Sequence, residues 1–122
     1  MAIPLVYVVD DDESVRESLG RLIRSVGFDV EAFASAEEFL NAGHRGAACL
    51  MLDIRMPGMS GLELHHALAG TDRELPVIFM TAHGSDKDVR ARALAAGAVD
   101  YLLKPLREDE VLSAIETALS SK

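Results

Sequence analysis

The chain has 122 residues, and 49% of them are hydrophobic, which is enough to form the core of one domain covering residues 1–122. Twelve Lys and Arg against twenty Asp and Glu give a net charge of −8, so the surface as a whole would repel a nucleic-acid backbone. A single cysteine excludes an internal disulfide, and no apolar run is long enough for a membrane span or a secretory signal. We therefore expect a cytoplasmic domain that neither binds DNA directly nor enters a membrane.

Five short segments rich in apolar residues, each bounded by polar residues, Gly or Pro, are typical of buried strands. In chain order they cover residues 5–9, 28–33, 48–52, 77–80 and 99–103. The second segment alternates apolar and acidic residues, and the fifth is interrupted by Asp100. Both patterns favour less buried positions at the edges of a sheet, so the other three strands belong in its centre.

Helical patterns alternate with these strands. Apolar residues repeat at helical spacing over residues 15–26 and 111–119, and residues 61–68 predict a shorter helix. Ser-x-x-Glu and Ser-x-x-Asp patterns, in which the serine caps the first turn, begin at Ser14, Ser35 and Ser85. Five strand–helix pairs predict an α/β fold with a doubly wound, mostly parallel sheet and helices on both faces.

Polar residues follow the strands at the points where the strands end. The acidic run 10–13 follows the first strand, Asp53 the third, Thr81 the fourth and Lys104 the fifth. Because the carboxyl ends of parallel strands share one edge of the sheet, we expect these residues to lie together. Each has an ordinary structural explanation, such as an acid at a helix start or a residue in a turn. The joint pattern is much harder to obtain by chance.

This combination of side chains indicates phosphoryl chemistry. Neighbouring carboxylates repel one another, and a hard divalent cation relieves the repulsion through oxygen ligands. Mg²⁺ fits best, because it commonly bridges one or two carboxylates to a phosphoryl group. A carboxylate can itself accept the phosphoryl group, and Asp53 is the acid that stands alone at a strand end. Lys104 and Thr81 would then hold the phosphoryl oxygens.

The chain resembles the receiver domain family of two-component response regulators almost from end to end. The motifs that carry the resemblance are Val8-Val9-Asp10-Asp11-Asp12, Asp53-Ile54-Arg55-Met56-Pro57 with Gly61, Thr81-Ala82 and Lys104-Pro105. Segments 35–40 and 97–101 are most similar to the FixJ-type subfamily, whose members usually carry a C-terminal helix-turn-helix transcription domain. We expect such a domain, absent from these 122 residues, to produce the output when the receiver domain is phosphorylated.

The resemblance implies a flavodoxin-like receiver fold with five helices and strand order 2-1-3-4-5. It implies that Asp53 is the phosphoacceptor, Lys104 the phosphate-binding lysine, and Thr81 and Tyr101 the residues that move on activation. It further implies a switch that is not a turnover enzyme and only phosphorylates and dephosphorylates itself.

The resemblance also implies a metal site. Asp10 and Asp11 correspond to the acidic pair, and Asp11, Asp53 and the backbone carbonyl of Arg55 would ligate Mg²⁺. A cis peptide bond between Lys104 and Pro105 is implied as well, a geometry found mainly before proline.

The implied phosphoryl donor is a histidine kinase, which we expect to dock on the first helix around Val15, Leu19 and Gly20. Phosphorylation adds about −1.5 to −2 charge, and we expect the response in residues 86–106. The resemblance also implies that phosphorylation favours a homodimer, formed through the fourth helix, fifth strand and fifth helix.

Arg55 and His83 would flank the phosphoryl group, and we hypothesise that they tune its lifetime. His65 and His66 are neighbours on a helix, point in different directions and form a poor metal pair. We expect both, together with His44, to be solvated.

Three other functions share parts of this pattern. A HAD-type phosphatase would use Asp-x-Asp, and Arg55 stands in place of the second acid, so the phosphoryl group should persist. A flavin or nucleotide binder on this fold would want a Gly-, Ser- or Thr-rich loop where this chain has acids. A free-standing receiver that relays phosphate or acts by protein contact stays open, because only the FixJ-type similarity favours a transcription factor.

Overall fold

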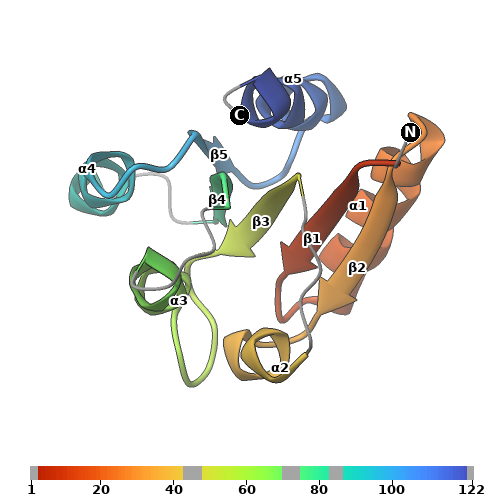
Figure 1. Ribbon diagram of the computed structural model, residues 1–122. Helices are drawn as coiled ribbons and strands as arrows, with labels where there is room; N and C mark the ends of the chain where they lie inside the picture. Colours follow the sequence, from red (N-terminus) through yellow and green to blue (C-terminus); the bar gives the residue numbers. More distant parts are fainter. Residues whose placement is uncertain (1–2, 43–47, 70–74, 83–86, 121–122) are drawn as a thin grey trace.

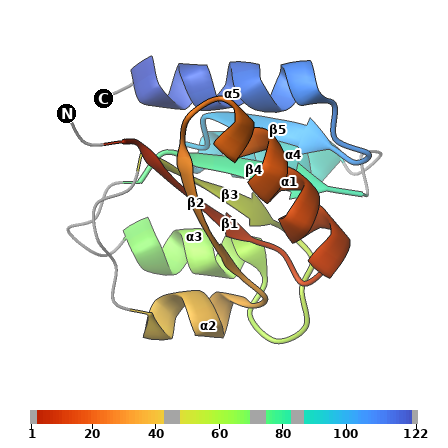
Figure 2. The same ribbon diagram turned by 90° about the vertical axis from the view of Figure 1, so that its right-hand side faces the viewer.

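The computed structural model describes residues 3–42, 48–69, 75–82 and 87–120, which form a five-stranded parallel sheet covered by helices on both faces (Figures 1 and 2). The strand order β2-β1-β3-β4-β5 confirms the predicted fold, with the two interrupted segments at the edges. In chain order the elements are β1 Leu5–Val9, α1 Glu13–Ser25, β2 Asp29–Phe33, α2 Ala36–Asn41, β3 Cys49–Asp53, α3 Gly61–Ala69, β4 Val77–Thr81, α4 Lys87–Ala95, β5 Asp100–Leu103 and α5 Glu108–Ser120.

The core consists of two apolar clusters, one on each face of the sheet, because successive residues of a strand point to opposite faces. On β1, Val6 and Val8 pack with residues of α1 and α5, whereas Tyr7 and Val9 pack with residues of α2, α3 and α4. Tyr7 also packs edge-on against Phe39 of α2, with ring centroids 5.3 Å apart. No helix in the described ranges combines the length and the apolar composition that a membrane span needs.

The helix starts were predicted only in part. Ser35 caps α2 as expected, its hydroxyl accepting a hydrogen bond from the Glu38 amide. The cap of α1 is Asp12 and not Ser14, since the Asp12 carboxylate accepts a hydrogen bond from the Ser14 amide itself. The third predicted cap, Ser85, lies outside the described residues.

The parallel register brings the strand ends to one edge. Asp53, the last residue of β3, pairs with Met80 of β4, and Thr81 pairs with Leu103 of β5. On the other side, the amide of Asp10 donates to the carbonyl of Phe33, at the end of β2. Residues that are far apart in the sequence therefore meet at the carboxyl edge of the sheet.

Candidate functional site

Three carboxylates meet at this edge. Asp10 directly follows β1, Asp11 begins the next loop and Asp53 ends β3, and one oxygen of each lies within 4.8 Å of the others. Asp10 and Asp53 are buried and Asp11 is exposed. The structure thus brings together the acids that the sequence placed at strand ends, with one of them open to solvent.

Lys104 supplies a positive charge to the cluster. Its Nζ lies 2.8 Å from Oδ2 of Asp10 and 3.6 Å from Oδ1 of Asp53. Burial lowers the pKa of Lys104, but the hydrogen bond and charge of Asp10 and the charge of Asp53 outweigh it, so the pKa lies above its ordinary value. Lys104 is therefore a cation held between two acids. The peptide bond to Pro105 is cis, as the resemblance implied.

Asp53 carries the electrostatic cost of this arrangement. Its pKa is raised from 3.8 to about 6, first by burial and then by the charge of Asp10, with a smaller contribution from Asp11, while Lys104 opposes the shift. The three acids outnumber the one lysine that pairs with them, so the cluster carries excess negative charge. The side-chain atoms that could ligate a metal here are carboxylate oxygens. Such a donor set fits a hard divalent cation such as Mg²⁺.

The orientation of Asp10 is fixed by the loop that follows it. Its Oδ1 accepts a hydrogen bond from the Asp12 amide at 2.9 Å, while its backbone carbonyl accepts one from Nη1 of Arg16 at 2.8 Å. With Oδ1 bound to the backbone, Oδ2 faces Lys104. Sequence reasoning did not assign this supporting role to Arg16, whose contact with Asp10 arises only in the fold.

Gly61 supports Asp53 from the other side. A Cβ atom at Gly61 would collide with the carbonyl oxygen of Asp53, and the Gly61 amide donates to the carbonyl of Ile54 at 2.9 Å. Gly61 therefore allows the start of α3 to approach the backbone of β3 closely. This accounts for the spacing between Asp53 and Gly61 in the sequence motif.

Thr81 and Tyr101 lie on neighbouring strands. Thr81 ends β4 and is 2% exposed, and its carbonyl accepts a hydrogen bond from the Lys104 amide at 2.8 Å. Tyr101 is 8% exposed with its hydroxyl oxygen buried, and it pairs with Phe79 across β4 and β5. The Tyr101 side chain therefore points inward, away from the solvated position that an edge-strand tyrosine often takes.

The expectation for His65 was wrong. His65 is half-buried and its ring packs edge-on against Phe79 of β4, with centroids 5.3 Å apart, because α3 turns this position toward the sheet. Its neighbour His66 is exposed, as expected. The expectations for His44 and His83 fall outside the described residues.

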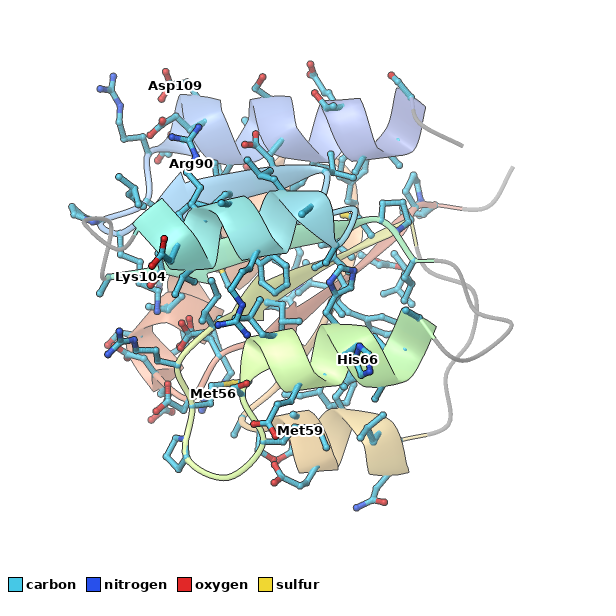
Figure 3. All side chains as sticks on the ribbon, turned by 90° about the vertical axis from the view of Figure 1, so that its left-hand side faces the viewer. Met56, Met59, His66, Arg90, Lys104 and Asp109 are labelled. Carbon is cyan, nitrogen blue, oxygen red and sulfur yellow. The ribbon has the colours of Figure 1, made fainter. Side chains whose placement is uncertain are left out.

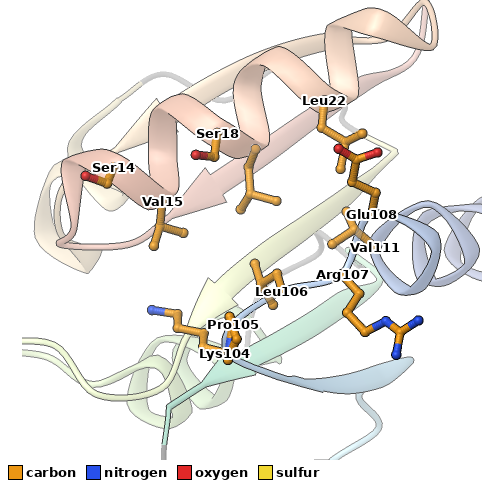
Figure 4. A pocket seen from close by; sticks show the side chains of 11 residues that line it. Ser14, Val15, Ser18, Leu22, Lys104, Pro105, Leu106, Arg107, Glu108 and Val111 are labelled. Carbon is orange, nitrogen blue, oxygen red and sulfur yellow. The ribbon is translucent and has the colours of Figure 1, made fainter.

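A pocket of about 340 Å³ lies between α1 and the segment that links β5 to α5 (Figure 4). Val15 and Leu19 line it, whereas Gly20, the third residue expected at the kinase contact, is buried and is not part of the lining. The complete lining is Ser14, Val15, Ser18, Leu19, Leu22, Lys104, Pro105, Leu106, Arg107, Glu108 and Val111. Since Lys104 belongs both to this pocket and to the acidic cluster, the two are contiguous.

Comparison with known proteins gives consistent matches. The family described as response regulator receiver domain matches residues 6–116. Response regulator protein TmoT of Ectopseudomonas mendocina is 47% identical over 116 residues, which are 94% of this chain and 52% of that protein. Transcriptional regulatory protein FixJ of Bradyrhizobium diazoefficiens is 39% identical over 115 residues, which are 93% of this chain and 56% of that protein.

Solved structures agree with these matches. FixJ-N has a TM-score of 0.88 and 38% identity, covering 100% of this chain and 98% of that chain. Response regulator StyR has a TM-score of 0.89 and 48% identity, covering 98% of this chain and 61% of that chain. The chain spans about half the length of TmoT and FixJ. Sequence and fold together show that the chain belongs to the response regulator receiver domain family of two-component systems.

Proposed function

We propose that this domain is a phosphorylation-activated switch, in which Asp53 accepts a phosphoryl group from a histidine kinase in the presence of Mg²⁺. The observation that carries the proposal is the convergence of Asp10, Asp11 and Asp53, with Nζ of Lys104 3.6 Å from an oxygen of Asp53. The membership of the receiver family supports the same chemistry.

In the proposed reaction an oxygen of Asp53 attacks the phosphorus of a phosphohistidine. A new O–P bond forms, the P–N bond breaks, and the imidazole leaves and takes up a proton. Lys104 then pairs with the phosphoryl oxygens, for which its position between Asp10 and Asp53 is suited, and the Thr81 hydroxyl donates a hydrogen bond to them. When bound, Mg²⁺ would neutralise charge on the phosphoryl oxygens, with Asp11, Asp53 and the Arg55 carbonyl as its protein ligands.

The proposed reaction is signalling and not turnover. Arg55 is exposed, two residues after Asp53, where a phosphatase of the aspartate type would hold its acid–base residue. An arginine remains protonated and does not activate water as a base. We therefore propose that the domain phosphorylates and dephosphorylates itself only, with a phosphoryl group that persists.

The pocket between α1 and the β5–α5 segment is the proposed docking surface for the kinase (Figure 4). Its apolar floor includes Val15, Leu22, Leu106 and Val111, and Lys104 stands at the edge that joins the acidic cluster. A helix that inserts an apolar side chain here would bring a neighbouring phosphohistidine to Asp53.

The proposed output surface is formed by α4, β5 and α5. Leu103 on β5 is 50% exposed. It borders a hollow that is also lined by Arg90, Tyr101 and Glu110, and Figure 3 shows Arg90 on α4. Mixed charges around an exposed leucine suit a reciprocal contact between two copies. FixJ is a transcriptional regulatory protein and is longer than this chain, which supports transcription control through a DNA-binding domain outside these residues.

The proposed function is tested with a small acyl phosphate in place of the kinase. Purified protein is incubated with acetyl phosphate and Mg²⁺, and its intact mass is measured with and without the cation. We expect the mass of one phosphoryl group to appear only with Mg²⁺ and to be absent from Asp53→Asn. Equal labelling of the variant would contradict the proposal.

A further inference from the structure

The loop between β3 and α3 is hydrogen-bonded to α2 through the carboxylate of Glu37. Oε2 of Glu37, in the first turn of α2, accepts a hydrogen bond from the amide of Met59 at 3.0 Å, across 22 positions of the sequence. Figure 3 labels Met59 on this loop, beside α2. Gly58 has a φ of +77°, and a Cβ atom there would lie 2.6 Å from the same Glu37 oxygen. The glycine thus permits both the turn and the approach of the carboxylate.

Other contacts hold the two ends of this loop. At its start, the amide of Ile54 donates to the carbonyl of Met80 at 3.1 Å, and the Met56 side chain is buried in the core. At its end, Ser60 and Glu63 form reciprocal side chain to backbone hydrogen bonds at 3.0 and 3.1 Å. Between Met56 and Ser60, the Glu37 carboxylate holds the tip of the loop from another element.

We propose that Glu37 is a positioning residue for phosphoryl acceptance. By holding the tip at Met59, it restrains the path of residues 55–58 and with it the Arg55 carbonyl that the proposed metal site uses. The effect on Asp53 chemistry rests on the proposed function, whereas the restraint of the loop does not. Glu37 touches neither Asp53 nor the acidic cluster in any contact described above, so it acts through the loop.

Four variants separate the effect of the hydrogen bond from the effects of charge and of the helix. Glu37→Ala removes the acceptor, and Glu37→Gln keeps an oxygen acceptor without the charge. Glu38→Ala is the matched control, because Glu38 is the adjacent exposed acid in the same first turn of α2. Gly58→Ala perturbs the same contact from the loop side, because its Cβ would fill the space of the carboxylate and its φ of +77° would strain the turn.

The first readout is Mg²⁺ binding by the unphosphorylated protein, followed through backbone amide NMR shifts, with the Met59 amide as the local reporter. We expect Glu37→Ala to shift the Met59 amide and to weaken Mg²⁺ binding by roughly threefold, the scale of one partly solvated hydrogen bond. Glu37→Gln should restore most of the affinity, Gly58→Ala should weaken it, and Glu38→Ala should leave it unchanged. Equal affinities for Glu37→Ala and Glu38→Ala would overturn the proposal.

The second readout is the rate of labelling by acetyl phosphate as Mg²⁺ is varied. We expect Glu37→Ala to label slowly at low Mg²⁺ and at the wild-type rate when Mg²⁺ saturates, since the loss lies in placing the ligand and not in Asp53 itself. A rate that stays low at saturating Mg²⁺ would overturn the positioning role. Wild-type protein that binds Mg²⁺ but accepts no phosphoryl group would contradict the proposed function alone, and the NMR titrations would still decide the role of Glu37.

Discussion

Asp53 is ionised in a place that disfavours its charge. Burial and the nearby Asp10 raise its pKa to about 6 from 3.8. The folded protein therefore binds this proton more tightly than the unfolded chain does. The stabilisation that results is complete below about pH 4 and is lost as the pH rises through about 6. At neutral pH the unliganded fold carries the cost of a charged Asp53.

Removing that charge should stabilise the unliganded protein. We expect Asp53→Asn to raise the free energy of unfolding in urea by on the order of 2 kcal/mol at neutral pH without divalent cations. The gain should shrink as the pH falls through 6, where wild-type Asp53 takes up its proton, and also when Mg²⁺ is added. The exposed Asp29→Asn serves as control and should change little. A gain independent of both pH and Mg²⁺ would contradict this explanation.

At the scale of elements, the start of α3 depends on the absence of a side chain at Gly61. We expect Gly61→Ala to destabilise the fold by about 3 kcal/mol in urea unfolding, because its Cβ would collide with the rigid backbone of Asp53. Gly20→Ala is the matched control within α1, where a Cβ would meet only the flexible Arg24 side chain at 3.1 Å. That variant should be neutral or gain up to about 1 kcal/mol from helix propensity. Equal effects at the two glycines would count against the backbone collision.

The packing of α3 on β4 predicts a pH effect of opposite sign. Burial, and then the charge of His66, lowers the pKa of His65 from 6.5. The unfolded chain therefore takes up this proton first, and the contribution of His65 to stability falls as the pH drops below about 6.5.

This contribution is best measured in the Asp53→Asn background, which removes the opposing effect of Asp53 in the same pH range. We expect His65→Gln to flatten the loss of stability between neutral pH and about pH 5, measured by thermal unfolding, while the exposed His66→Gln does so less. If stability falls with pH at the same slope in both variants, His65 is not the source of the pH dependence.

The elements show what could be predicted from the sequence. The edge positions of β2 and β5 followed from their interrupted apolar pattern, and the cap at Ser35 from its spacing to Glu38. The cap of α3 by Ser60 and Glu63 follows the same Ser-x-x-Glu pattern, so the sequence contains the signal, but it was not predicted. At α1 the cap is Asp12, two residues before the predicted Ser14, since local patterns do not rank two candidates that lie so close together.

The site could be predicted as a set of strand ends, because parallel strands must bring Asp10, Asp53 and Lys104 to one edge. The contacts between elements could not. The packing of His65 on Phe79 and the bond from Met59 to Glu37 depend on how helices settle on the sheet, which no local spacing encodes. Lys104 also lies closer to Asp10 than to Asp53, and this difference results from tertiary geometry.

For the whole molecule, we expect phosphorylation to favour a dimer through α4, β5 and α5. Beryllofluoride with Mg²⁺ mimics the phosphoryl group, and sedimentation velocity should then show dimers that are absent without it. Leu103→Asp places a charge on the exposed leucine of β5 and should keep the protein monomeric. Leu40→Asp, at a leucine on α2 that is 40% exposed, should not. Dimers unaffected by Leu103→Asp would place the interface elsewhere.

The central claim is that Asp53, among several neighbouring acids, is the residue that accepts the phosphoryl group. Reduction with borohydride after labelling by acetyl phosphate converts an aspartyl phosphate to homoserine, and peptide mass spectrometry then locates it. We expect homoserine at position 53 alone, and only when Mg²⁺ was present during labelling. Homoserine at Asp10, Asp11 or Asp12, with position 53 unmodified, would contradict the account.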